Sequence, residues 1–122
     1  MSFDELYKIA DSLSKKTIIN DKSSYGNVAV ACEADNGKVY KGISFKTTCN
    51  VGFCAETIVI GQMLLDGVTK INKLVAIHNK ENLVSPCGKC REQIYQLNKS
   101  NLDCEIMLKD KIIKLRDLLP EP

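Results

Sequence analysis

Two short cysteine-containing stretches constrain this chain more than any other feature of its sequence. The first is Cys54-Ala55-Glu56, and the second is Pro86-Cys87-Gly88-Lys89-Cys90. Three thiols and one carboxylate are the groups that a catalytic zinc site requires. Three protein ligands leave the fourth tetrahedral position open for water, and a neighbouring carboxylate can move protons. We therefore expect a fold that brings the two stretches together.

The pattern of apolar residues predicts one domain, residues 1–122, in which helices alternate with strands. Helices are expected at 2–16, 54–66 and 87–98, strands at 28–34, 38–45, 73–78, 104–108 and 112–115, and a final turn at 116–119. Residues 21–27, 47–53 and 79–85 are expected to be loops, and Asn36-Gly37 favours a tight hairpin. This order predicts an α/β fold, a three-layer α/β/α arrangement with a mixed sheet of about five strands and helices on its faces.

Charge and hydropathy exclude several classes of protein. The net charge is only +2, and the lysines are scattered among acidic residues, which argues against a nucleic-acid-binding surface. No apolar run approaches the roughly 18 residues of a membrane span, and the acidic N-terminus does not resemble a signal peptide. The six cysteines are then best explained as thiols of a reducing compartment, which predicts a cytoplasmic protein.

Both cysteine stretches fall at predicted helix N-termini. Unpaired backbone N–H groups and the helix dipole stabilise thiolates there. Three thiolates on Zn²⁺ leave the site with a net negative charge, and we expect Arg91 to offset this charge by hydrogen bonding to the sulfurs. Glu56 lies on the first turn of its helix, where its side chain can reach beside the metal without binding it.

The Cys-x-Glu and Pro-Cys-x-x-Cys motifs together resemble those of the zinc-dependent cytidine deaminase family. Cysteine at the first position is typical of its small Cys₃, tetrameric branch, and residues 52–61 are most similar to blasticidin S deaminase. The resemblance covers most of the chain, from Tyr25 to Pro120.

The resemblance implies a cytidine-deaminase-like fold with one Zn²⁺ per subunit, bound by Cys54, Cys87 and Cys90. Glu56 would shuttle protons while the amino group of cytidine, deoxycytidine or blasticidin S is converted to the oxo form and ammonia is released. The implied partners are a small nucleoside-type molecule and three further copies of the chain in a homotetramer. The residues considered for substrate contact are Tyr25, Asn27, Asn50, Phe53, Ala55, Ser85 and Pro86.

The region before the first cysteine departs from the family pattern. Cytidine deaminases carry an Asn-x-Glu-Asn-like segment that holds the ribose, whereas Ser44 to Phe53 contains no Glu. Gly26 follows Tyr25 where the family has Ser, and Glu92 replaces a Gln. The sequence therefore leaves the identity of the substrate open.

Other interpretations of the motifs remain. Cys87 and Cys90 alone would suit a redox pair, and Cys49 as a fourth ligand would close a structural zinc site. With a closed structural zinc site, the chain would be a non-catalytic zinc-binding oligomeric domain. A deaminase of a different amino-heterocycle is a further alternative.

The remaining cysteines and the one histidine are expected to be structural. Cys32 and Cys104 are expected to be buried free thiols. His78 is expected to be a packed core or loop residue rather than a ligand. The helix at 54–66 is apolar nearly all round, which predicts contact with the sheet on one side and a second subunit on the other.

Overall fold

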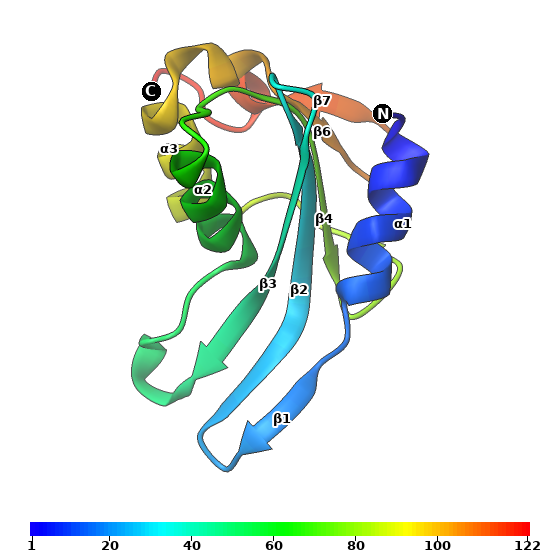
Figure 1. The fold of residues 1–122 in the computed structure, drawn as a ribbon, viewed down its shortest axis with the longest axis vertical. Helices are drawn as coiled ribbons and strands as arrows, with labels where there is room; N and C mark the ends of the chain where they lie inside the picture. The colour runs from blue at the N-terminus through cyan, green and yellow to red at the C-terminus, as the bar shows by residue number, and fades with distance from the viewer.

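The structure is a computed structural model that describes all residues 1–122. Three α-helices, seven strands and three short 3₁₀ helices follow one another along the chain (Figure 1). The α-helices are α1 (Phe3–Leu13), α2 (Ala55–Leu65) and α3 (Gly88–Leu97), and the 3₁₀ helices span Thr48–Asn50, Lys99–Asp103 and Leu115–Asp117. The strands are β1 (Thr17–Asn20), β2 (Ser23–Ala34), β3 (Val39–Thr47), β4 (Ile71–His78), β5 (Asn82–Leu83), β6 (Glu105–Met107) and β7 (Ile112–Lys114).

One mixed sheet contains all seven strands. Its order is β1-β2-β4-β6-β7, with β3 paired to β2 and β5 paired to β4. Only β4 and β6 are parallel, and the other pairs are antiparallel. The predicted mixed sheet is confirmed, but it has seven strands rather than about five. The two strands that the sequence did not indicate, β1 and β5, have four and two residues, too few to show a periodic pattern.

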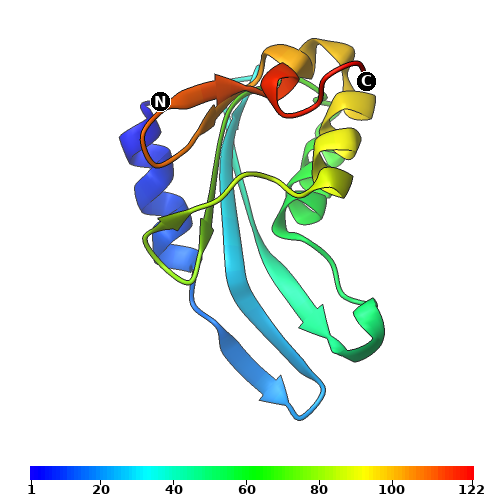
Figure 2. The same ribbon diagram turned by 180° about the vertical axis from the view of Figure 1, so that it is seen from behind.

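Helices cover both faces of the sheet, which confirms the α/β/α arrangement. Figures 1 and 2 show α1 on one face and α2 with α3 on the other. Leu6 and Ala10 of α1 pack against Val75 and Ile77 of β4 on the first face. The opposite face holds the larger core, with residues of α2, α3 and the sheet. Ser2 is the N-cap of α1 and the first residue of a capping box with Glu5.

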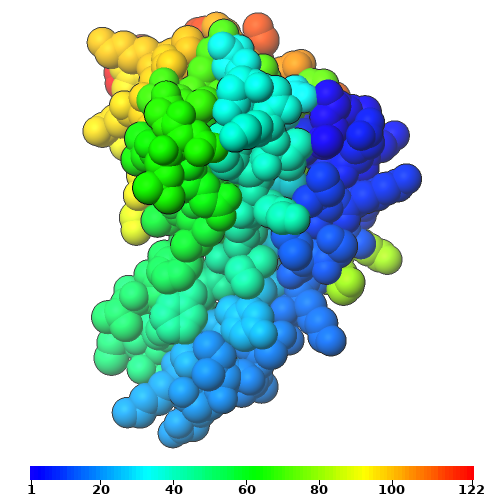
Figure 3. Space-filling view, in the orientation of Figure 1, coloured from blue at the N-terminus to red at the C-terminus, as the bar shows by residue number.

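Strands β1, β2 and β3 continue past the helices as a protruding arm, residues 17–25 and 45–53 (Figure 3). The loop predicted at 21–27 is wrong, because Ser23 to Tyr25 pair with both β1 and β3. The pairing is irregular between Tyr25 and Ala29, where Gly26 adopts a φ of 81°. A side chain at Gly26 would collide with the carbonyl of Lys15, so the position requires glycine.

Buried free thiols are confirmed for Cys32, on β2, and for Cys104, next to β6. No helix of the structure combines the length and the apolar character needed to cross a membrane.

Candidate metal centre and substrate cavity

The two cysteine stretches form the N-termini of neighbouring helices. Cys54 is the N-cap of α2 and Cys87 is the N-cap of α3, both in extended backbone conformations. Neither side chain makes a capping hydrogen bond to its helix. Their sulfur atoms therefore remain available to a metal, and Cys90 contributes a third sulfur from the first turn of α3.

The sulfur positions fit a zinc ion. The Sγ atoms of Cys54 and Cys87 are 3.9 Å apart, those of Cys87 and Cys90 are 3.5 Å apart, and all three lie within 4.8 Å of one another. A tetrahedral zinc with bonds of about 2.3 Å holds its sulfur ligands about 3.8 Å apart. Cys49 is exposed and does not belong to this group, so the chain supplies three ligands here and leaves a fourth position free.

This donor set could hold a metal ion, and the pKa values of the thiols indicate what metal binding must overcome. Burial raises the pKa of the Cys54 thiol, and it raises that of Cys90 more strongly. For Cys87, burial is outweighed by hydrogen bonds from the Cys90 backbone and from the neighbouring thiols, which lower the pKa. The expected stabilisation of thiolates at a helix N-terminus is thus seen at Cys87 alone. Metal binding would have to release protons from the other two thiols.

Glu56 occupies the first turn of α2, directly beside the metal-binding sulfurs. Its side chain is 5% exposed and makes no ion pair. Burial raises the pKa of the carboxyl, while hydrogen bonds from its own backbone amide and from Cys90 act in the opposite direction. A carboxyl in this environment can hold or release a proton at the face of the cavity.

Arg91 does not hydrogen-bond to the cysteine sulfurs as expected. Its guanidinium donates to the carbonyls of Pro86 and Leu118, at 2.7 and 3.0 Å, and to the hydroxyl of Ser85 at 3.1 Å. It therefore ties the segment before Cys87 to the C-terminal segment of the chain. Compensation of thiolate charge by Arg91 through space stays a prediction.

A cavity of about 490 Å³ opens in front of the metal-binding residues. It is lined by Cys54, Cys87 and Glu56, and by five of the residues predicted to contact a substrate: Asn27, Asn50, Phe53, Ala55 and Ser85. Side chains from β2, β3, β4, α2, α3 and two loops thus meet at one place.

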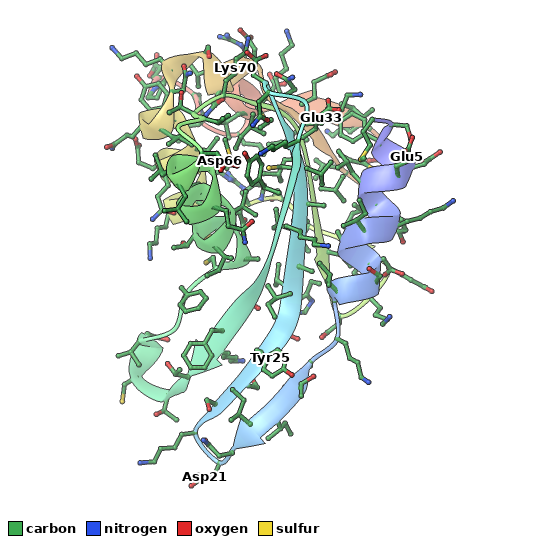
Figure 4. The ribbon with its side chains drawn as sticks, in the orientation of Figure 1. Glu5, Asp21, Tyr25, Glu33, Asp66 and Lys70 are labelled. Carbon is green, nitrogen blue, oxygen red and sulfur yellow. The ribbon has the colours of Figure 1, made fainter.

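Tyr25 and Pro86, also predicted as substrate contacts, do not line this cavity. Tyr25 lies on the arm, below the helices in Figure 4. The irregular pairing at Gly26 interrupts the alternation of side chains, so Tyr25 and Asn27 do not share a wall of the cavity. Pro86 is buried, and its carbonyl accepts from Arg91, which gives it a role in holding the loop.

Two phenylalanines form an aromatic wall of the cavity. Phe45 of β3 and Phe53 exchange backbone hydrogen bonds of 3.0 and 2.9 Å, and their ring centroids are 5.4 Å apart. Gly52 makes this approach feasible, because a side chain there would collide with the carbonyl of Phe45. The two ring planes are tilted by 47° to each other and present an apolar surface, which suits contact with a heterocyclic ring.

His78 lines the cavity but is not part of the cysteine group, in agreement with the expectation that it is not a metal ligand; its place at the cavity was not predicted. It lies at the end of β4, opposite Val28 of β2, and its Nε2 is 3.1 Å from Nδ2 of Asn27. Ser44, Lys46 and Thr47 also line the cavity and were not predicted. The pairing of β4 with β2 brings His78 to the cavity, which no local sequence signal could have shown, whereas Ser44, Lys46 and Thr47 belong to the segment 44–53 whose departure from the family pattern was already apparent in the sequence.

Comparisons with known proteins agree with this geometry. Residues 2–105 match the family described as "Cytidine and deoxycytidylate deaminase zinc-binding region". A cytidine deaminase of Sporosarcina psychrophila is 32% identical over 68 residues, 55% of this chain, and the match spans only 50% of that relative's length.

Solved structures share the fold. Cytidine deaminase from Mycobacterium leprae superposes with a TM-score of 0.82 at 20% identity, over 99% of this chain and 99% of that one. Cytidine deaminase from Bacillus anthracis superposes with a TM-score of 0.74 at 16% identity, over 98% of this chain and 87% of that one.

Proposed function

Because the chain belongs to the cytidine and deoxycytidylate deaminase zinc-binding family, we propose that it is a zinc-dependent hydrolytic deaminase. It would convert the amino group of a cytosine-ring nucleoside to the oxo form with release of ammonia. Cytidine, deoxycytidine and the nucleoside antibiotic blasticidin S are the candidate substrates, the last in line with the Cys₃ branch that residues 52–61 resemble. One observation supports the proposal: a buried carboxyl lines the same cavity as Cys54 and Cys87, two of the three clustered cysteines whose sulfurs fit zinc.

Bound by Cys54, Cys87 and Cys90, zinc would lower the pKa of a water molecule in its open position toward neutrality. Glu56 would accept a proton as the water oxygen adds to the amino-bearing carbon, and would donate that proton to the adjacent ring nitrogen. It would then transfer the remaining hydroxyl proton to the amino group, which leaves as ammonia. Because Glu56 has no ion-pair partner, its carboxyl is free to change partners between these transfers.

Side chains of the cavity would orient the ring for this reaction. The Phe45 and Phe53 wall offers an apolar surface on which a heterocycle can stack. Asn27 and His78 offer polar contacts, and Oδ1 of Asn27 has no hydrogen-bond partner in the protein. A ring with donor and acceptor groups at its edge would satisfy that atom.

The test is to measure zinc content and ammonia release with cytidine, deoxycytidine and blasticidin S. We expect about one zinc per chain and turnover of at least one of the three compounds. Glu56→Gln should keep the zinc and lose about 10²–10⁴-fold in kcat, the usual contribution of a proton-transferring group. Glu105→Gln, an exposed carboxylate on β6, is the matched control and should leave kcat unchanged.

Two results would refute the proposal in different ways. Undiminished activity of Glu56→Gln with zinc bound would remove Glu56 from the mechanism. Zinc binding without turnover of any cytosine compound would leave the alternatives, a non-catalytic zinc-binding oligomeric domain or a deaminase of a different amino-heterocycle. A panel of other aminated heterocycles then separates these two.

We also propose that the chain assembles as a homotetramer of this domain in the cytoplasm. The last turn of α2 exposes Leu64 and Leu65, which are 55% and 88% exposed. Exposed apolar side chains on a helix that also packs on the sheet are typical of a subunit contact. A reducing compartment is required to keep the three metal-binding thiols available.

A further inference from the structure

The turn between β4 and β5, residues Asn79 to Glu81, has a strained backbone. Its three residues have φ angles of 52°, 53° and 60°, and none of them is glycine. Residues with a Cβ atom enter this left-handed region at a cost in free energy, and they do so singly rather than in runs. All three side chains are exposed, so packing does not offset the cost. Contacts of the backbone must therefore hold the turn.

Two side chains at the C-terminal end of α1 accept hydrogen bonds from this turn. Oγ of Ser14 accepts from the backbone N–H of Lys80 at 3.1 Å. Oδ1 of Asp11 accepts from the backbone N–H of Glu81 at 2.7 Å. A charged acceptor makes a stronger hydrogen bond than a neutral one, so Asp11 makes the stronger of the two contacts. Figures 1 and 2 show the loop after β4 beside this end of α1.

The end of α1 is itself fixed on the sheet. Ser14 is fully buried, and its hydroxyl donates to the carbonyl of Ile77 on β4 at 3.4 Å. Leu6 and Ala10 pack on the same strand, from the face opposite α2 and α3. A helix packed in this way moves little, so its end is a firm support for the turn.

The turn connects two parts of the substrate cavity. His78, the residue before the turn, lines the cavity, and so do Val84 and Ser85 after it. Cys87 follows Ser85 by two residues. Between the turn and this segment, β5 pairs with β4 through only two residues. The path of the chain into Cys87 therefore depends on how the turn is held.

Resting on the proposed deaminase function, we propose that Asp11 is a positioning residue for the metal centre, with Ser14 as its partner. Neither side chain lines the cavity, so both act through the turn and not on the substrate. From the opposite face of the sheet they hold the left-handed turn, which sets the position of Cys87. Without these contacts the turn relaxes to ordinary backbone angles, and Cys87 is held less firmly relative to Cys54 on α2.

Zinc affinity, measured by competition with a chelator, is the direct test because it requires no substrate. Asp11→Ala should weaken zinc binding by about tenfold, the usual worth of a hydrogen bond to a charged group. Asp11→Asn should bind zinc nearly as well as the unsubstituted protein, because its Oδ1 can still accept. Lys8→Ala removes an exposed charge of α1 that makes no ion pair, and as the matched control it should leave zinc affinity unchanged. Unchanged affinity in Asp11→Ala would overturn the proposal.

Glycine substitutions separate positioning from a general loss of stability. Glycine adopts left-handed angles without strain, so Glu81→Gly added to Asp11→Ala should restore zinc affinity. Cys49→Gly relieves the same φ of 60° on the arm, outside the group of metal-binding sulfurs, and should not restore it. Restoration by both glycines would indicate a general effect on stability, and restoration by neither would exclude the strained turn as the cause. Either result would overturn the proposal.

Ammonia release from cytidine separates this inference from the proposed reaction. Deamination of cytidine, together with unchanged zinc affinity in Asp11→Ala, would overturn the positioning role and leave the deaminase intact. Weaker zinc binding by Asp11→Ala, in a protein that deaminates no cytosine compound, would support the positioning role and count against the deaminase.

Discussion

Asn101 allows the stability of the metal-binding helix to be worked out from individual hydrogen bonds. Its side chain is fully buried in the 3₁₀ helix that follows α3. Its Oδ1 accepts from the backbone N–H of Ile71 at 2.8 Å, and its Nδ2 donates to the carbonyls of Thr69 and Ile94 at 3.0 and 2.9 Å. The amide thus joins the end of α3 to the start of β4.

Asn101→Ala removes all three hydrogen bonds and leaves a buried N–H group without a partner. At about 1 kcal/mol for each bond, we expect the free energy of unfolding to fall by about 3 kcal/mol. In a chain of this size the corresponding decrease in Tm is roughly 10 °C. Since α3 carries Cys87 and Cys90, the apparent zinc affinity should fall as well.

Urea and thermal unfolding of the zinc-free protein at one fixed protein concentration measure the effect. Asn72→Ala is the matched control, because Asn72 follows Ile71 on β4 without a side-chain hydrogen bond in the structure; it should change stability by less than about 0.5 kcal/mol. Equal stabilities of the two variants would refute the bond-by-bond reasoning.

Three further predictions address the metal, the pH and the subunit contact. Cys54→Ser should lose stoichiometric zinc and Cys49→Ser should keep it, as metal analysis of the dialysed variants will show; equal zinc contents would contradict the three-sulfur site. The hydrogen bond from Tyr40 lowers the pKa of Asp66, at the end of α2 (Figure 4), so its stabilisation is lost as pH falls below about 4. The free energy of unfolding of Asp66→Asn should not show this decrease at acid pH. Parallel pH profiles of the variant and the unsubstituted protein would count against the prediction. Leu65→Glu should reduce the molar mass measured by light scattering, and an unchanged mass would exclude that face from the contact.

Local signals predicted most of the elements, because each signal depends on residues close together in the chain. Ser2 marks the start of α1 through its own capping box, and the Asn36-Gly37 pair connects β2 and β3 as expected. Spacing within the cysteine stretches also sufficed to propose the three metal ligands. In contrast, the extension of β2 to Ser23 depends on pairing with β1 and β3, which no local pattern reports.

By itself, therefore, the sequence determined the α/β/α order and the residues that can bind zinc and move protons, since both follow from side-chain chemistry at short spacing. Only the tertiary structure decided what surrounds them. The pairing of β2 with β4 brings His78 to Asn27, and the turn of the arm brings Lys46 near Lys22. The tertiary structure also places the Arg91 guanidinium in hydrogen bonds to backbone carbonyls instead of to the cysteine sulfurs. The contacts of His78 with Asn27 and of Arg91 with Leu118 join segments far apart in the chain, and such contacts arise only when the whole domain folds.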